Sequence, residues 1–287
     1  MRPAKCGAIQ RLVIAFHGKD WVKNKDQFFF RHTRPVARAL VRSSGSERMT
    51  EACDKVWGST VSPTDVESAG IFSGFYAAKP ASYFSRARAD FVGRLPVDRT
   101  AEILEVGCGT GATGALALGQ GRCGRYVGIE LFEAAAVEAR EVLSEVITGN
   151  VETLKFDWQP ATFDGIILSE VLEHLVEPGE VIKKLSRFVR PGGMLLASSP
   201  NISHWRVVRE LLLGRFQLAD QGVFDRTHLR WFTPATFANL FETAGFEVKE
   251  IGPVTAFSPR TKLFSRLTGG RFDHLFMTQI AIVAIKR

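Results

Sequence analysis

From residue 101 to the end, the chain alternates between short apolar runs and amphipathic stretches. The apolar runs have the length of buried strands, which predicts strands at residues 103–106, 126–129, 163–168, 194–197, 246–248 and 279–285. Helical spacing predicts helices at 112–118, 132–143 and 181–189. Strands that alternate with helices form a parallel sheet covered on both faces. The pattern therefore predicts an α/β protein with a doubly wound, mostly parallel sheet.

The first hundred residues lack this alternation. Residues 49–98 predict a helical cap, with helix formers around Ser85–Val92 and an end at Pro96. Residues 1–48 have no sustained periodicity and carry eleven Lys and Arg against three acidic residues. We interpret them as a disordered basic tail or as a start assigned too early, with Met49 as the alternative start. An organelle transit peptide is a weaker alternative, because Asp20 and Asp26 are acidic.

Composition changes this picture only in part. The 287 residues are 45% hydrophobic and 23% charged, which is typical of a globular protein. The net charge of +7 lies wholly in the first 48 residues, since the remainder holds 26 basic and 27 acidic residues. The body of the chain therefore gives no electrostatic reason to expect a nucleic-acid partner.

The cysteines and the lengths of the apolar runs bear on the compartment. Cys6, Cys53, Cys108 and Cys123 lie far apart without CxxC spacing, which fits a reducing, cytoplasmic location. No run approaches the roughly 18 apolar residues of a membrane span, so we expect no transmembrane segment. Peripheral contact with a membrane stays open, and the oligomeric state is not predicted.

A glycine-rich loop follows the first predicted strand. Gly107, Gly109 and Gly111 would let a ligand approach the backbone, and Glu130 follows at the end of the next strand. A carboxylate at that position can accept hydrogen bonds from both hydroxyl groups of a ribose. The spacing predicts a nucleoside-containing cofactor, but it also matches a dinucleotide fingerprint, so NAD stays an alternative at this point.

Residues 105–111, Glu-Val-Gly-Cys-Gly-Thr-Gly, resemble motif I of the class I S-adenosylmethionine-dependent methyltransferases. Further pieces follow in the order of that family, at residues 127–130, 163–167, 170–175, 190–193 and 199–201. Residues 222–233 and 82–88 resemble a subgroup found among bacterial polysaccharide and glycosyl-transfer genes. The piece Glu-Val-Leu-Glu-His is also similar to quinone-pathway O-methyltransferases.

The resemblance implies a Rossmann-like methyltransferase fold over residues 99–287, with seven strands, the last antiparallel. It implies S-adenosyl-L-methionine as the cofactor. The implied cofactor-binding residues are Glu105, Gly107, Cys108, Gly109, Glu130, Asn150, Val151 and Ser169. Asn150 stands where many relatives have an acid, and its amide oxygen can still accept a hydrogen bond from adenine.

Methyl transfer to a hydroxyl needs a base, for which His174 is our first candidate. A scaffold role, holding a neighbouring turn, is an equal alternative. Glu170, Glu173 and His174 would share one side of a helical turn and could hold a divalent cation such as Mg²⁺. We favour instead that these acids cap the next helix or pair with Lys183 or Lys184, and we predict no metal.

An insertion at about residues 201–233 mixes polar and aromatic residues and predicts a lid over the acceptor, with an apolar helix at 207–213. Within it, Asp225 and His228 are an alternative catalytic pair, and a surface salt-bridge cluster is the competing interpretation. The predicted substrate residues are Tyr83, Asn201, His204 and Arg230.

The function predicted from the sequence is O-methylation of a small-molecule or glycan hydroxyl, in polysaccharide biosynthesis. The alternatives are a cation-dependent quinone or phenol O-methyltransferase, an NAD-dependent oxidoreductase or epimerase, and a nucleoside-binding protein without turnover.

Overall fold

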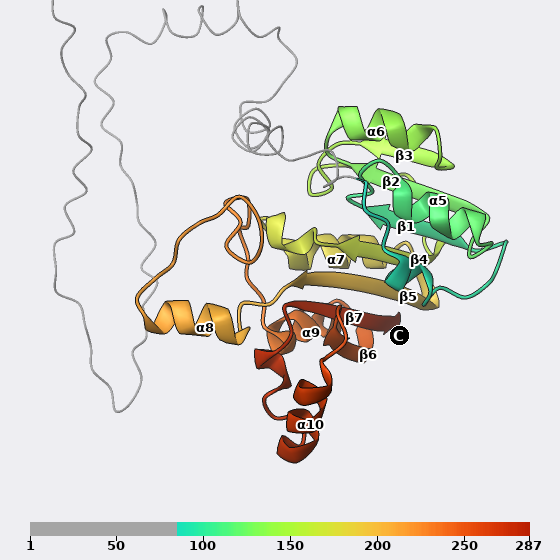
Figure 1. Ribbon diagram of the computed structural model, residues 1–287. Helices are drawn as coiled ribbons and strands as arrows, with labels where there is room; N and C mark the ends of the chain where they lie inside the picture. Colours follow the sequence, from blue (N-terminus) through green and yellow to red (C-terminus); the bar gives the residue numbers. More distant parts are fainter. Residues whose placement is uncertain (1–84) are drawn as a thin grey trace, which may run out of the picture. The chain divides into compact units, whose positions relative to one another are not determined.

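The computed structural model describes residues 85–287. The predicted basic tail, most of the predicted helical cap and Tyr83 lie outside these residues. Within them, seven strands form one sheet in the order β3-β2-β1-β4-β5-β7-β6 (Figure 1). The strands are β1 (Glu102–Val106), β2 (Arg125–Glu130), β3 (Glu145–Thr148), β4 (Phe163–Ser169), β5 (Val189–Pro200), β6 (Phe246–Pro253) and β7 (Gln279–Lys286).

The first five strands pair in parallel, and β7 runs antiparallel to both β5 and β6. The predicted α/β fold, with a mostly parallel sheet and an antiparallel end, is confirmed. Because β1 has β2 on one side and β4 on the other, the sheet changes direction of winding at β1. Ligands of such sheets bind at this switch point, beyond the carboxyl ends of the strands.

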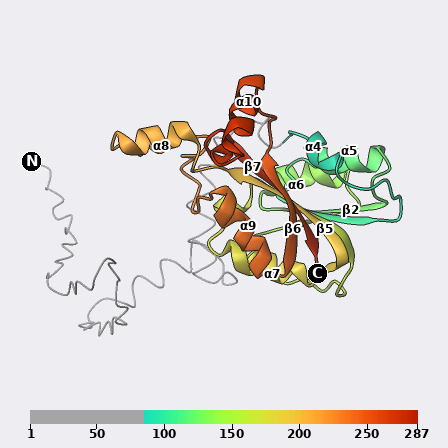
Figure 2. The ribbon, with the colours of Figure 1, turned by 90° about the horizontal axis from the view of Figure 1, so that it is seen from below.

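Helices lie on both faces of the sheet (Figure 2). They are α4 (Ala89–Val92), α5 (Ala112–Gly119), α6 (Glu133–Arg140), α7 (Pro178–Ser186), α8 (Trp205–Leu212), α9 (Pro234–Thr243) and α10 (Pro259–Thr268), with short 3-10 helices η1 (Leu172–His174) and η2 (Asp273–Leu275). Each helix in the described residues is too short or too polar to span a lipid bilayer.

The strands bury side chains on both faces. Leu104 and Val106 point into a core shared with α7 and α9, whereas Ile103 points into a second core with α4 and α5. This alternation with period two explains why the strands are apolar throughout rather than amphipathic.

Several local expectations differ from the structure. The predicted helix over residues 85–92 is only the single turn α4, and the predicted turn at 191–193 lies inside β5. On β5, Val189 pairs with Phe163 of β4 and Met194 pairs with Gly165. The register therefore shifts between these two pairs, and the irregular stretch of β5 between them contains Gly192 with its positive φ. The apolar pattern did not predict α10. The start of this helix carries a Ser258 cap and Pro259, which are typical of a helix N-terminus.

Candidate active site

The glycine-rich loop lies at the switch point, between the end of β1 and the start of α5. Gly107, Gly109 and Gly111 all have positive φ, at 72°, 54° and 82°. Residues with a Cβ rarely adopt this conformation, so the loop depends on glycine at these positions. The Cys108 side chain, in contrast to its backbone, does not line the loop, because it is buried. Its sulfur lies about 2.5 Å from the position that a Cβ on Gly128 would take.

Glu130 ends β2 beside this loop. Its carboxylate accepts hydrogen bonds from the backbone N–H of Gly109, at 2.8 Å, and of Phe132, at 3.0 Å. Burial raises the pKa of Glu130, and the backbone hydrogen bonds oppose that rise. Each carboxylate oxygen has a second lone pair, so Glu130 can hold the loop and still accept hydrogen bonds from ligand hydroxyls.

Glu105 is buried one strand away, on β1. Its carboxylate accepts a hydrogen bond of 2.9 Å from the Tyr126 hydroxyl and a further one from Thr113 on α5. Burial raises the pKa of Glu105 to about 7, although these hydrogen bonds lower it in part. The side chain thus ties β1 to β2 and α5 beneath the loop.

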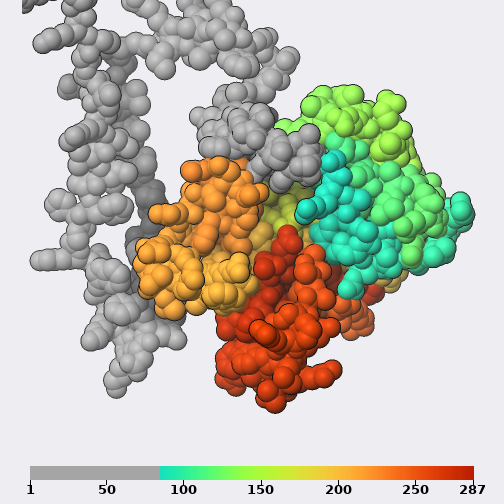
Figure 3. All heavy atoms as spheres, in the orientation of Figure 1, coloured from blue at the N-terminus to red at the C-terminus, as the bar shows by residue number. Residues whose placement is uncertain are grey.

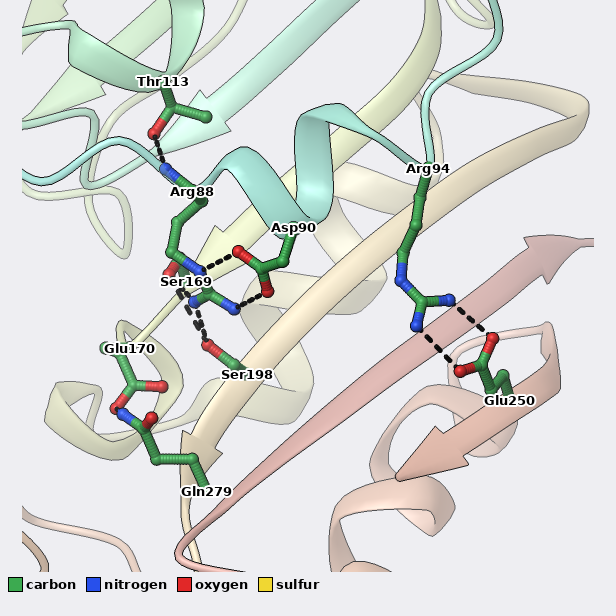
Figure 4. Close-up of polar contacts among 9 residues, drawn as sticks. All are labelled: Arg88, Asp90, Arg94, Thr113, Ser169, Glu170, Ser198, Glu250 and Gln279. Carbon is green, nitrogen blue, oxygen red and sulfur yellow. Dashed lines mark hydrogen bonds and ion pairs between the residues drawn. The ribbon is translucent and has the colours of Figure 1, made fainter. Parts of the chain in front are cut away.

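Arg88 enters the site from the segment before α4 and was not among the predicted site residues (Figure 4). Its guanidinium donates hydrogen bonds to the hydroxyls of Ser169, at the end of β4, and Ser198, on β5. It also pairs with Asp90 at 2.7 Å, and its backbone N–H donates to Thr113. With a side chain 12% exposed, Arg88 places a positive charge at the carboxyl ends of two central strands.

Asn150 lies after β3, where the resemblance places the contact with adenine. Its side-chain oxygen accepts the backbone N–H of Glu152, at 2.9 Å, and its carbonyl accepts those of Thr153 and Leu154. Val151 is buried next to it. These contacts fix the turn, and the side-chain NH₂ group remains as a donor.

Glu173, His174 and His228 converge beyond the end of β4. Each offers a ligand atom within 4.8 Å of the others. The His174 and His228 rings lie 4.8 Å apart, centroid to centroid. Glu173 is buried, and neither of its carboxylate oxygens makes a hydrogen bond within the described part of the chain. Burial raises its pKa well above the usual range, and the charge of Glu170 adds to this.

Backbone contacts assemble this cluster from two distant segments. The Glu173 carbonyl accepts the N–H groups of Leu229 and Arg230, at 2.8 and 3.0 Å. The Nδ1 atoms of His174 and His228 each lie 3.1 Å from a carbonyl oxygen, of Thr227 and Val223 respectively. A carbonyl can only accept, so Nδ1 of each ring carries a hydrogen and donates it.

Glu170 does not join that cluster, which corrects the predicted sharing of one side by residues 170, 173 and 174. Its φ is +55° and the turn that follows is a 3-10 helix, so the side chain points elsewhere and accepts a hydrogen bond from Gln279 at 3.0 Å (Figure 4). The favoured pairing with lysines is also wrong. Lys183 pairs with Glu180, and Lys184 donates to backbone carbonyls.

The residues predicted to lie in the lid make different contacts from one another. Asn201 is fully buried: its NH₂ group donates to the carbonyls of His274 and Met277, and its oxygen accepts from Ser203. Every position of its amide is filled, so a substrate contact would have to displace one of these groups. Arg230 donates to the Val176 carbonyl and lies 3.8 Å from Glu177.

Asp225 accepts hydrogen bonds from the N–H and hydroxyl of Thr227, which shapes the loop that carries His228. His204 caps α8 by accepting the Arg206 N–H, and burial lowers its pKa. It also lines a cavity of about 240 Å³ between the start of α8 and the segment that leads into α10.

Comparison with known proteins places this architecture in a family. A family model described as "Methyltransferase domain" matches residues 77–251. The chain is 32% identical over 151 residues to a "Probable S-adenosylmethionine-dependent methyltransferase" of Mycolicibacterium smegmatis, covering 52% of this chain and 53% of that protein. It is 28% identical to the ubiquinone biosynthesis O-methyltransferase of Thiobacillus denitrificans, covering 62% of this chain and 78% of that protein.

A crystal structure of an S-adenosylmethionine-dependent methyltransferase from Archaeoglobus fulgidus shares the fold. Its TM-score is 0.51 at 20% identity, and the match covers 71% of this chain and 96% of that one. The chain therefore belongs to the class I S-adenosylmethionine-dependent methyltransferases, as its motifs predict. The chain spans about half the length of the first relative named above.

Proposed function

We propose that this methyltransferase transfers a methyl group to a hydroxyl group of an uncharged small molecule or glycan. The observation that carries this proposal is the cluster of two imidazoles and a buried carboxyl group beyond the end of β4. A hydroxyl must lose a proton as it is methylated, and a lone pair on an imidazole Nε2 can take that proton. His174 and His228 are the two imidazoles of this cluster.

The residues at the switch point fit S-adenosyl-L-methionine. Its ribose diol needs an acceptor, which Glu130 offers, and its carboxylate needs a donor, which the Arg88 guanidinium offers. Asn150 offers an amide for the edge of adenine. When bound, the cofactor supplies an activated methyl group on a sulfonium, with the thioether as the leaving group.

The remaining steps belong to the protein. Arg88 and Glu130 would hold the two ends of the cofactor, which fixes the line along which a nucleophile must approach. The hydroxyl oxygen would lie toward the cluster, where an imidazole Nε2 accepts its proton. Glu173 is buried beside both rings, and in its ionised form it would favour the charged imidazolium that results.

Isothermal titration calorimetry with S-adenosylhomocysteine tests the cofactor site. We expect Arg88→Ala and Glu130→Gln each to weaken binding by about 10- to 100-fold, since each removes a charge-assisted interaction. Arg94→Ala is the matched control, because Arg94 pairs with Glu250 away from the strand ends (Figure 4). Unchanged affinity in both site variants would contradict the assignment.

The acceptor class is tested with a carbon-13-labelled methyl donor and a panel of alcohols, phenols, amines and carboxylic acids. We expect label on oxygen, and a loss of about 100- to 10,000-fold in kcat for the variant that lacks the base, His174→Asn or His228→Asn, with cofactor affinity retained. Label on nitrogen, or full turnover in both variants, would overturn the proposal.

A cation-assisted O-methyltransferase is the second candidate, and the orphaned carboxylate of Glu173 supports it. A divalent cation held by Glu173, His174 and His228 would polarise the acceptor oxygen. The similarity to a ubiquinone biosynthesis O-methyltransferase favours a quinone-related acceptor in that case. Titration with Mg²⁺, Mn²⁺ and Zn²⁺ would show binding that Glu173→Gln abolishes. Activity that survives exhaustive chelation would leave the base mechanism as the explanation.

A further inference from the structure

Two helices beyond the strand ends expose large apolar side chains. Along α10 and the turn after it, the exposed residues are Leu263, Phe264, Leu267 and Phe272, at 58%, 40%, 77% and 39%. No residue of α10 is buried. In and after α8 they are Trp205, Leu211, Leu212, Leu213, Phe216 and Leu218, with Leu212 82% exposed. Phe264 contacts the Phe276 ring at 5.5 Å between centroids, but a helix with no buried side chain gains little from packing against the core, so its exposed leucines need another partner.

The charge around these residues is mostly positive, although Asp220 and Asp273 flank the two segments. Residues 254–272 contain four basic residues and no acidic one. Residues 204–219 contain three basic residues and a single acid, Glu210, which pairs with Arg209 and Arg215. Residues 49–287 taken together are not basic, since they hold 26 basic and 27 acidic residues. The positive charge is therefore concentrated where the apolar side chains are exposed.

Sheet topology places both helices at one edge. The end of β5 at Pro200 pairs with Gln279, and the end of β6 at Pro253 pairs with Ile280, so the segments that follow both strands leave the sheet together. Figures 1 and 2 show α8 and α10 extending from this edge, and Figure 3 shows them reaching the surface in orange and red. The cavity between their starts is lined by His204, Trp205, Phe257, Ser258 and Thr261.

We propose that α8 and α10 dock the protein on an anionic lipid bilayer. The Leu, Phe and Trp side chains would enter the boundary between headgroups and acyl chains, while the Arg and Lys groups contact lipid phosphates. A second copy of the chain fits less well, because a two-fold contact through this surface would bring like charges together.

Docking would turn the cavity between the helices toward the membrane. Its walls combine aromatic rings with the hydroxyls of Ser258 and Thr261 and the imidazole of His204, and they carry no carboxylate among the described residues. Such a cavity suits an uncharged, hydroxylated head group. The acceptor would then be a membrane-associated molecule, an extension that rests on the proposed O-methyltransferase function.

Co-sedimentation of the full chain with lipid vesicles tests the docking. Vesicles of phosphatidylcholine with phosphatidylglycerol are compared with pure phosphatidylcholine at one salt concentration. We expect binding to the anionic vesicles, and a loss of about tenfold or more in the partition coefficient for the double variants Leu263→Ser/Leu267→Ser and Leu211→Ser/Leu212→Ser. Serine removes the apolar area without changing the charge.

The control variant is Val97→Ser/Val137→Ser, which removes apolar side chains that are 74% and 51% exposed elsewhere on the protein. It should bind vesicles as the wild type does. Binding that all variants retain would assign the interaction to the eleven basic residues of the first 48 and overturn the proposal. So would a dimer, seen in sedimentation velocity, that the same α8 and α10 variants dissociate. Calorimetry with S-adenosylhomocysteine on each variant reports separately whether the methyltransferase site is intact.

Discussion

Three glutamates are buried around the strand ends and a fourth, Glu170, is half-buried there, which is unusual for side chains that are charged in water. Burial raises the pKa of Glu105, Glu130, Glu170 and Glu173. The positive charge of Arg88 lowers the pKa of Glu105 and Glu170 in part. Burying several carboxyl groups at one edge of the sheet costs free energy unless cationic groups lie beside them. The sulfonium and ammonium groups of the cofactor would relieve that cost.

The buried carboxyl group of Glu105 makes the free energy of unfolding depend on pH. Its pKa rises from the usual 4.5 in the unfolded chain to about 7 in the folded protein, so the folded state keeps its proton after the unfolded state has lost it. The free energy of unfolding therefore falls as pH rises from about 4.5 to about 7. We expect Glu105→Gln to remove this fall and to gain up to about 3 kcal/mol above pH 7, since one pKa unit is worth about 1.4 kcal/mol.

Urea denaturation of wild type and Glu105→Gln at several pH values measures the difference. Glu138→Gln, at an exposed position on α6, is the control and should leave the pH profile unchanged. Parallel profiles for wild type and Glu105→Gln would show that the buried carboxyl does not titrate in this range.

Local sequence signals could predict the residues of the cofactor loop but not the groups that distant segments bring together. The glycines and Glu130 follow strand ends at a readable spacing. Arg88 meets Ser169 and Ser198, 81 and 110 residues away, and the backbone contacts of Leu229 and Arg230 with Glu173 bring His228 beside it. The predicted cluster used Glu170 because it assumed an α-helical turn where the chain forms a 3-10 turn.

At the scale of elements, α5 shows how closely a helix must approach the sheet. A Cβ on Gly114 would lie 2.3 Å from Cδ2 of Leu143 and 2.5 Å from Cδ1 of Tyr126. We expect Gly114→Ala to cost about 1–3 kcal/mol of unfolding free energy, because the added methyl group has no room.

Gly119, at the end of the same helix, is the matched control. A Cβ at this position would meet no heavy atom of the described residues within 4 Å, so alanine there should stabilise by up to about 1 kcal/mol through helix propensity. Urea denaturation midpoints compare the two variants. Equal effects of both substitutions would mean that α5 can shift away from β2.

Elements with strong periodicity were predicted well, and weakly patterned ones were not. The strands of the central sheet are apolar on both faces and stand out from the sequence. β3, by contrast, is only four residues long and half-buried, and no residue of α10 is buried. Because α10 packs no stripe against the core, hydrophobic periodicity carried no signal for it.

At the scale of the whole molecule, the cofactor site and the proposed docking surface occupy different parts of the same edge. Hydrogen–deuterium exchange with saturating S-adenosylhomocysteine should separate them. We expect slower exchange at residues 86–90, 107–111, 130–132 and 169–171, because bound ligand must leave before these segments open. At a ligand concentration of 100 times Kd the slowing can reach about 100-fold. Residues 255–272 should exchange at their ligand-free rate, and should slow instead when anionic vesicles are added. Protection of α10 by the nucleoside alone would mean that the two surfaces respond as one, and that docking and cofactor binding are linked.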